Sequence, residues 1–409
     1  MTTVKVPNLL WYGNQPMELR FPEQWDVEVL DPPGFKKAPI DDESILSSLG
    51  EPVGCKPLSE LAGGAKEVVI GFDDITRPTR VGVVLPKILS EIEEAGVPPS
   101  NIRLIPALGM HGAMTNVEFR KKLGDDVVRN YPVYNHNPYE NCDNLGDSPS
   151  GIPVYINREF MSCDLKIGIG CITPHVHAGF GGGGKLVLPG LSGAQTIKTF
   201  HGEVLQRDPW STGLGKSEGN VMIDAIEEVV KMSGLDMKID ALINDRGEIT
   251  DIFVGDPIKA YRAGVEVAKE HYATPMSPDK DIVVVNAYAK YSEMAICMMM
   301  ALPLVNLAGS TIVLVVDAPE GQVCHYLMRS FGKEYGGCGY VKRGPLPENL
   351  KVIVCSSYPD RTMCDLFAPV EHVTLTGDWS ETLSILTSEH PGIASVAVIP
   401  DGTMQYFRT

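Results

Sequence analysis

The chain has 409 residues, of which 44% are apolar and 21% are charged, and its formal net charge at pH 7 is -17. This length exceeds what one ordinary hydrophobic core can use, so it predicts two domains, and the composition is typical of a folded globular protein. The acidic balance disfavours nucleic acid as a partner, because a nucleic-acid-binding protein needs a basic face.

Membrane insertion, secretion and disulfide bonding are also disfavoured. No apolar stretch reaches the roughly 20 uncharged residues that a bilayer-spanning helix needs. The first residues, MTTVKVPNLLWYGNQPMEL, have no cationic region followed by a long apolar core, so we expect a cytoplasmic protein. The nine cysteines form no CxxC pair, which argues against a structural zinc site or a disulfide framework.

Short β-branched runs alternate with stretches of helical periodicity along the chain. Most of the runs are continuously apolar, as in parallel strands covered on both faces, so the sequence predicts an α/β fold with mainly parallel sheets. In chain order we predict a strand at 67–72, a helix at 81–95, strands at 102–107 and 165–169, helices at 221–233 and 257–272, and strands at 282–285, 311–316, 352–355 and 396–399.

A segment rich in Pro, Ser and Thr at 271–280, HYATPMSPDK, separates a predicted helix from a new strand. We interpret it as the boundary between an N-terminal domain of residues 1–274 and a C-terminal α/β domain of residues 281–409. Residues 1–65 are Pro-rich and weakly periodic, and we expect them to form a small antiparallel piece of the first domain.

The predicted strand at 67–72 leads into the sequence FDDITRPTR. Asp74 can orient a neighbouring side chain or cap the following helix, and Arg77 can bind a carboxylate or phosphate through two hydrogen bonds. In isolation, the segment equally fits a helix N-cap with a surface ion pair.

Four of the nine histidines lie in predicted loops rich in glycine or on a predicted helix that follows such a loop. His111, in ALGMHGAM, follows a predicted strand, where ligands gather in open α/β sheets. His175 and His177 begin a glycine-rich loop, and His201 lies on a predicted helix, AQTIKTFHGEVL. Imidazole titrates near neutral pH and binds nickel, zinc or copper, so acid/base and metal roles both stay open. An HxH pair could hold zinc, although no third ligand is evident.

The glycine-rich loop reads PHVHAGFGGGGKLVLPG and follows the predicted strand at 165–169. Its consecutive glycines are Gly181, Gly182, Gly183 and Gly184. Glycine permits the positive φ angles that bring backbone N–H groups close to an anion. Lys185 follows as in a P-loop, but Leu186 stands where a P-loop has the Ser or Thr that holds Mg²⁺. The loop thus predicts a phosphate-bearing ligand beside a lysine, unless it is a plain glycine-rich turn.

Five separated motifs together resemble the lactate racemase (LarA) family. They are DITRP at 74–78, GMHG at 109–112, PHxxAGFxGGxK at 174–185, PG at 189–190 and a helical histidine at 201. Their order and spacing agree with that family over most of the chain, and NAY at 286–288 and VxVIPDG at 396–402 also fit. The resemblance implies two α/β domains with a cofactor cleft between them. The N-terminal domain would bear the cofactor and the catalytic residues, and the C-terminal domain would contribute to the substrate pocket.

The resemblance also implies a cofactor, a nickel-pincer nucleotide. It would be bound covalently through Lys185, with His201 as the protein ligand to nickel, and it would be missing when the maturation enzymes are absent. His111 and His175 would be the two acid/base residues. The cofactor side would further include Gly181, Gly182, Gly183, Gly184, Asp74 and Thr76, and the substrate side would include Arg77 and Tyr288.

The activity that this implies is racemisation or epimerisation of a small 2-hydroxy acid, by reversible hydride transfer from C2 through a 2-keto acid. One histidine takes the hydroxyl proton and the second serves the opposite enantiomer. The expected partners are this small molecule and the cofactor-maturation proteins, with neither nucleic acid nor a membrane, and a homo-oligomer is left open.

The sequence departs from the family after NAY. Lactate racemases usually carry a Gln and a Lys there, and those positions fall near Ile296 and Met299, both apolar. We therefore expect a substrate other than lactate, with a larger or more apolar side chain. The Met-rich segment could line its pocket, although a row of methionines is also typical of a core. Trp379 could match a family tryptophan near the cofactor.

Two alternatives to this activity stay open. One is a nucleotide- or phosphate-binding protein of the same fold with altered catalysis. The other is a hydroxy acid oxidoreductase that uses the same cofactor.

Overall fold

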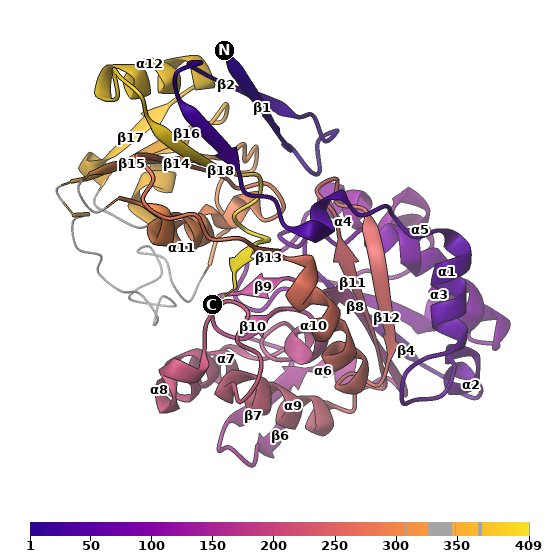
Figure 1. The fold of residues 1–409 in the computed structure, drawn as a ribbon. Helices are drawn as coiled ribbons and strands as arrows, with labels where there is room; N and C mark the ends of the chain where they lie inside the picture. The colour runs from indigo at the N-terminus through magenta and orange to yellow at the C-terminus, as the bar shows by residue number, and fades with distance from the viewer. Residues whose placement is uncertain (307–308, 326–345, 348, 367–369, 409) are drawn as a thin grey trace. The chain divides into compact units, whose positions relative to one another are not determined.

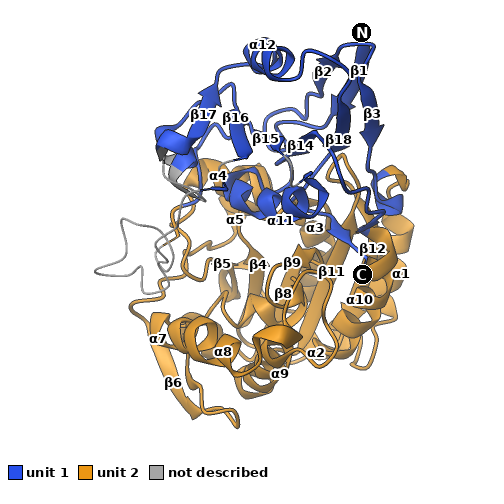
Figure 2. Cartoon of the chain, turned by 60° about the vertical axis from the view of Figure 1, so that its left-hand side comes forward, with its two compact units in different colours: residues 1–35, 272–323, 341–409 blue, residues 36–271, 324–340 orange. Residues whose placement is uncertain are grey.

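The structure, a computed structural model, describes residues 1–306, 309–325, 346–347, 349–366 and 370–408 (Figure 1). The chain divides into two units, which Figure 2 colours separately. Unit 1 comprises residues 1–35, 272–323 and 341–409, and unit 2 comprises residues 36–271 and 324–340. None of the helices in the described ranges is long and apolar enough to cross a membrane.

Unit 2 is built on a five-stranded sheet with the order β12-β11-β8-β4-β5. Neighbouring strands run parallel except β12, which pairs antiparallel with β11. β4 and β8 are buried almost throughout, which explains why their sequences are mostly apolar. The strands are β4 (Val68–Asp73), β5 (Ile102–Ala107), β8 (Leu165–Cys171), β11 (Met237–Ile243) and β12 (Ile249–Gly255).

The strand order of unit 2 explains where a ligand site can form. The chain passes from β4 to β5 on one side, and then to β8 on the other side of β4. At such a reversal, the loops after the two central strands diverge and leave a crevice at their carboxyl ends. The loops after β4 and β8 are FDDITRPTR and the glycine-rich segment, so the fold brings two of the predicted motifs to this point.

Helix α3 (Val81–Glu94) shows how the helices of unit 2 are fixed to the sheet. Its apolar positions recur every three to four residues, so Leu85, Ile88 and Ile92 are buried in the same core cluster as Ile70 and Leu104 of the sheet. Helix α9 ends at Gly234 in the left-handed conformation that glycine favours. The other main helices are α1 (Asp42–Gly50), α2 (Leu58–Ala62), α4 (Asn116–Leu123), α5 (Asp125–Asn130), α9 (Val221–Ser233) and α10 (Lys259–His271).

Shorter elements complete unit 2 between β5 and α9. They are the antiparallel pair β6 (Cys142–Asp147) and β7 (Pro153–Asn157), α6 (Arg158–Met161), the short pair β9 (Pro174–His175) and β10 (Gly179–Phe180), α7 (Ala194–Thr199) and α8 (Leu205–Arg207).

Unit 1 contains a parallel six-stranded sheet with the order β17-β16-β15-β14-β18-β3. Here too the order reverses, because β15 lies on one side of β14 and β18 on the other. The strands are β3 (Asp26–Val29), β14 (Ile282–Asn286), β15 (Ser310–Val315), β16 (Leu350–Cys355), β17 (Val373–Thr376) and β18 (Ser395–Ile399). Unit 1 also has the hairpin β1 (Thr2–Val6) and β2 (Met17–Phe21), the pair β13 (Ala273–Thr274) and β19 (Tyr406–Phe407), and helices α11 (Cys297–Ala301) and α12 (Trp379–Glu389).

The predicted α/β fold is confirmed, and all ten predicted elements are present with ends that differ by at most two residues. The start of the chain differs from our expectation. β1 and β2 are antiparallel as expected, but β3 pairs with β18, so residues 1–35 group with residues 272–323 and 341–409. Local periodicity carries no information on this long-range pairing. The cofactor cleft between two domains stays a prediction.

Candidate active site

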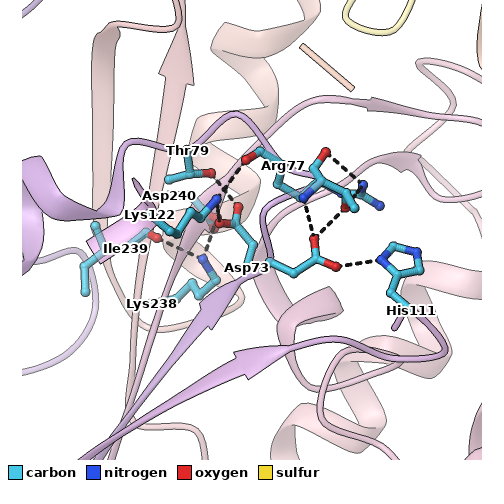
Figure 3. A network of polar contacts seen from close by, with 10 residues as sticks. Asp73, Arg77, Thr79, His111, Lys122, Lys238, Ile239 and Asp240 are labelled. Carbon is cyan, nitrogen blue, oxygen red and sulfur yellow. Dashed lines mark hydrogen bonds and ion pairs between the residues drawn. The ribbon is translucent and has the colours of Figure 1, made fainter. Parts of the chain in front are cut away.

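The turn after β4 presents Arg77 on a hydrogen-bonded support (Figure 3). The carboxylate of Asp74 is buried, and its Oδ1 accepts bonds from the backbone N–H of Thr76 at 3.1 Å and from its hydroxyl at 2.5 Å. The Thr76 hydroxyl oxygen in turn accepts a bond from Arg77 Nη1 at 2.8 Å. Such a chain limits the directions that the guanidinium can take, which favours bidentate binding of a carboxylate.

His111 lies after β5 and is bound to the same aspartate. Its Nδ1 is 2.6 Å from Asp74 Oδ2. A carboxylate only accepts, so Nδ1 carries the proton and Nε2 of the neutral ring has a lone pair. Burial raises the pKa of Asp74, but the His111 charge, the hydrogen bond to His111 and the charge of Arg77 outweigh burial and hold that pKa well below its usual range. Asp74 is thus an anion that orients His111 as a base.

His175, at the end of β9, has the opposite arrangement. Its Nδ1 accepts bonds from the backbone N–H groups of His177 and Ala178, both at 3.1 Å. Backbone N–H groups only donate, so the lone pair is on Nδ1 and the proton of the neutral ring is on Nε2. In their neutral forms, Nε2 of His111 is a hydrogen-bond acceptor and Nε2 of His175 is a hydrogen-bond donor.

The glycine loop is held by close packing. Gly182 and Gly183 have φ angles of +86° and +53°. A Cβ on Gly183 would lie 2.5 Å from the ring of Tyr261, and one on Gly184 would lie 2.3 Å from Val230. The N–H of Gly183 donates to Asp240 at 2.9 Å. The sequence predicted glycines for their φ angles, and the structure adds tight packing against α9 and α10. Phosphate binding by the loop stays a prediction.

Lys185 and His201 lie close together. Lys185 belongs to a 3-10 turn, Gly183–Leu186, and His201 belongs to a π-helical turn, Phe200–Val204, between α7 and α8. Burial and the charge of Lys185 lower the pKa of His201 to about 3, so the ring is neutral at physiological pH. Its Nδ1 donates to the Ile197 carbonyl at 3.1 Å, which leaves the Nε2 lone pair for a metal ion. Single π-helical turns often mark functional sites.

Two further histidines, His325 and His177, lie beside the residues described above. His325 lies opposite His111 in an isolated antiparallel bridge, with ring centroids 5.2 Å apart, and it contributes to the lowered pKa of His201. The ring of His177 is 6.1 Å from that of His175, and burial and the charge of Lys185 lower its pKa. We did not predict His325 from the sequence, because no local motif surrounds it and only a long-range strand contact brings it to His111.

The structure therefore brings together every predicted site residue of unit 2. Contacts or electrostatic interactions connect Arg77, Thr76, Asp74, His111, His325, His201, Lys185, His177 and His175 in one series. The zinc site considered for His175 and His177 gains no support. In the described ranges, no group of three or more His, Cys, Asp or Glu side chains is arranged to hold a metal ion.

Tyr288 belongs to unit 1, where the motifs NAY and PDG meet at the reversal between β14 and β18. Its side chain is buried, its hydroxyl bonds Asn14, and its N–H donates to Asp401 at 3.3 Å. Asp401 also accepts bonds from the N–H groups of Ala289 and Thr403. Burial raises the pKa of Asp401 to about 6, although these hydrogen bonds oppose the shift. The two motifs thus form a loop support, and substrate binding by Tyr288 stays a prediction.

Other residues singled out in unit 1 occupy different environments. Trp379 packs on Phe21 with ring centroids 5.2 Å apart, and its Nε1 donates to the Arg20 carbonyl at 3.0 Å, so it is a core residue of unit 1. In the Met-rich segment, Met300 is buried while Met299 is 46% exposed.

Comparisons with known proteins show which proteins this chain resembles. Residues 12–213 match the family model for the lactate racemase N-terminal domain. A lactate racemase from Thermoanaerobacterium thermosaccharolyticum is 31% identical over 288 residues, which are 69% of this chain and 66% of that protein. A lactate racemase from Lactiplantibacillus plantarum is 27% identical over 394 residues, which are 88% of this chain and 90% of that protein.

Solved structures also resemble this chain over most of its length. The lactate racemase apoprotein from Thermoanaerobacterium thermosaccharolyticum is similar over 100% of both chains, with a TM-score of 0.76 and 25% identity. A crystal structure of a protein from Thermotoga maritima covers 91% of this chain and 100% of its own, with a TM-score of 0.67, and at 20% identity it shows the fold alone.

Proposed function

Because the chain belongs to the lactate racemase family, and with it to the isomerases, we propose that it is a nickel-pincer nucleotide-dependent racemase or epimerase of a 2-hydroxy acid. The single observation that carries this proposal is the opposite arrangement of His111 and His175. Inversion at one carbon needs a base that takes the hydroxyl proton and an acid that returns one, and the Nε2 atoms of these two rings are an acceptor in His111 and a donor in His175.

The residues present fit this cofactor. Lys185 lies on a turn packed closely between α9 and Tyr261, as an anchoring residue requires. His201 is neutral and has its Nδ1 bound to a carbonyl, which is the usual state of a metal-binding imidazole. We propose that Lys185 binds the nucleotide covalently and that His201 ligates nickel. When bound, such a cofactor supplies a reversible acceptor for the hydride on C2 of the substrate.

The side chains of the protein then bind the substrate and move its protons. Arg77 binds the carboxylate of the hydroxy acid, held in direction by Thr76 and Asp74. Nε2 of His111 takes the hydroxyl proton, and Asp74 stabilises the resulting imidazolium. After the planar keto acid turns over, His175 in its protonated form gives the Nε2 proton to the keto oxygen and becomes neutral, and the opposite enantiomer forms. The forward reaction therefore starts with His111 neutral and His175 protonated, and the reverse reaction starts with these two states exchanged.

The substrate itself is a further part of the proposal. We infer a 2-hydroxy acid other than lactate, because the positions where the family usually has Gln and Lys fall near Ile296 and Met299, which are apolar. A site that lacks these two polar groups gains less from a small polar substrate and more from an apolar side chain. His325, beside His111, is an additional polar group that such a substrate would meet.

The test is co-expression with the cofactor-maturation proteins, which we propose as its partners. We expect intact mass and metal analysis to give nickel and a mass adduct on the peptide with Lys185. Chiral chromatography of a panel of 2-hydroxy acids should give both enantiomers from either one, with larger substrates preferred over lactate. The Lys185→Ala variant is the matched control and should fold without an adduct. A wild-type protein without an adduct under these conditions contradicts the cofactor, and net oxidation without inversion contradicts the racemase.

A further inference from the structure

Two buried lysines and two aspartates lie beneath the candidate site in unit 2 (Figure 3). We call Asp73, Lys122, Lys238 and Asp240 the buried charge cluster. The side chains of Lys122, Lys238 and Asp240 are at most 1% exposed, and that of Asp73 is 15% exposed. Moving an ammonium group out of water is unfavourable unless it is paired and hydrogen-bonded, so two such groups in one place need an explanation.

One half of the buried charge cluster supports Arg77. Nζ of Lys122, on helix α4, forms an ion pair with Asp73 Oδ1 at 2.7 Å and donates to the backbone carbonyl of Arg77 at 2.8 Å. Asp73 also accepts a bond from the hydroxyl of Thr79. Both ends of the turn that carries Arg77 are thereby bound to buried side chains.

The other half supports the glycine loop. Nζ of Lys238 forms an ion pair with Asp240 Oδ1 at 2.6 Å and donates to the carbonyl of Ile239 at 2.8 Å. The second oxygen of Asp240 accepts the bond from the N–H of Gly183. Gly183 is the first residue of the 3-10 turn that includes Lys185. The carboxylate of Asp240 therefore fixes the start of the turn, and Lys238 fixes the carboxylate.

The two halves converge at Gly170, near the carboxyl end of β8. A Cβ on Gly170 would lie 3.3 Å from Asp73 Oδ2, 3.3 Å from Lys238 Nζ and 3.7 Å from Asp240 Oδ1. The strand has no side chain at the point where these three charged groups approach one another. A glycine inside a buried strand weakens the strand, so its presence here agrees with a requirement for this close approach.

Stability of the fold does not explain the buried charge cluster. Replacing a buried ion pair by apolar side chains of similar volume is often neutral or stabilising, so such a pair contributes little to folding. An apolar pair cannot accept the N–H of Gly183, however, and it cannot donate to the carbonyl of Arg77. The contacts that only charged or polar groups can make are those that reach the two functional loops.

We propose that Lys238 and Asp240 are positioning residues for Lys185, and that Lys122 and Asp73 are positioning residues for Arg77. The cofactor anchor and the substrate-binding arginine then share one buried support, although they lie on different loops. This inference rests on the proposed function for the roles of Lys185 and Arg77, whereas the mechanical part of it can be tested in the protein without cofactor.

Hydrogen exchange of the apoprotein, followed by mass spectrometry, tests the Asp240 end. We expect Asp240→Asn to raise the exchange rate of the amides in residues 183–186 about tenfold, because the loop loses its charged acceptor. Exchange in β5 should stay at the wild-type rate. The double variant Lys238→Met with Asp240→Leu removes both charges and leaves none unpaired, so it should melt near the wild-type temperature and still exchange rapidly in the loop.

A matched control removes an ion pair that does not reach the loop. Arg262 on α10 pairs with Glu227 on α9 at 2.7 Å, and its side chain is mostly exposed. Arg262→Gln should leave loop exchange and the yield of the Lys185 adduct at wild-type values, whereas both Asp240 variants should lower that yield after co-expression with the maturation proteins. Lys122→Met, at the other end, should raise KM for the hydroxy acid about tenfold with an unchanged adduct yield.

Wild-type loop exchange and a full adduct yield in the double variant would overturn the proposal. So would uniformly faster exchange through the whole of unit 2, since that pattern indicates a role in overall stability alone. If even the wild-type chain gains no adduct, the proposed function fails, and the exchange experiment still decides whether Asp240 holds the loop.

Discussion

Two buried aspartates, Asp74 in unit 2 and Asp401 in unit 1, each follow a parallel strand at a reversal of strand order, yet their surroundings differ. Asp74 binds the ring of His111 and lies near Arg77, and its pKa is lowered. Asp401 accepts bonds from neutral N–H and hydroxyl groups, and burial raises its pKa to about 6. Position at the carboxyl end of a strand is therefore no guide to function by itself, and the charge of the partners decides whether the aspartate is an anion that orients a histidine or a support for a loop.

The largest expected effect on activity concerns two histidines of unit 2, His175 and the His111 that Asp74 binds. Replacing His111 or His175 by Ala should lower kcat/KM for racemisation by about 10²–10⁴, because each variant lacks either the base or the acid. The equilibrium constant of a racemisation is one, so kcat/KM must fall equally from both enantiomers. Initial rates by chiral chromatography measure this, with circular dichroism as a control for folding. A variant that keeps activity in either direction would contradict the assignment of His111 and His175 as the acid/base pair.

The pH dependence of stability provides a direct test of the two aspartates. A lowered carboxyl pKa stabilises the fold above the unfolded pKa of about 4, and the contribution is lost on acidification. The advantage of the wild type over Asp74→Asn should therefore shrink as pH falls below about 4. A raised carboxyl pKa has the opposite sign, so the contribution of Asp401 is lost as pH rises from about 4 to 6, by about 3 kcal/mol.

Denaturant unfolding of the wild type, Asp74→Asn and Asp401→Asn between pH 3 and 8 separates the two cases. The Asp401→Asn variant should lack the loss of stability between pH 4 and 6 that Asp401 causes in the wild type. If both variants changed the pH dependence in the same direction, the contrast between the aspartates would be wrong.

Packing of the glycine loop gives a smaller effect. A methyl group on Gly184 would approach Val230 to 2.3 Å, so Gly184→Ala should destabilise the protein by about 1–3 kcal/mol. Gly181 is the matched control, because a methyl group there would have only ordinary contacts, at 3.4 Å or more, and no positive φ. Equal unfolding midpoints for the two variants in urea would show that packing does not fix the loop.

The smallest effect on activity is expected at Trp379 of unit 1. Trp379→Phe should lower stability by about 1–2 kcal/mol, because the core loses volume and one hydrogen bond to Arg20. It should leave kcat/KM within about twofold, since the ring lies in the core of unit 1. A large loss of activity with unchanged stability would restore the idea of a tryptophan beside the cofactor.

Strands could be predicted from the sequence where a run of apolar residues coincides with burial of the strand on both faces. Buried parallel strands such as β14 and β18 contain continuous apolar runs. The residues after β4 and β8 could be recognised as candidate site residues because they follow mostly apolar strands. β11 escaped prediction, because its apolar pattern is interrupted by Lys238 and Asp240, both fully buried. Charged residues normally indicate an exposed position, so only the folded structure reveals that their partners are inside. His325 was missed for a related reason, since its significance depends on a distant strand.

The π-helical turn at His201 has a consequence for how the site could arise or be lost. A π-helical turn has one residue more than the corresponding α-helical turn, so it is equivalent to a single-residue insertion into a continuous helix from α7 to α8. Deleting the exposed Gly202, whose Cβ position is open, would restore regular α-helical geometry there. Residues on one side of the deletion would then rotate by about 100° relative to those on the other. If the residues after the deletion keep their packing, a change of one codon turns the imidazole of His201, the proposed nickel ligand, to another side of the helix.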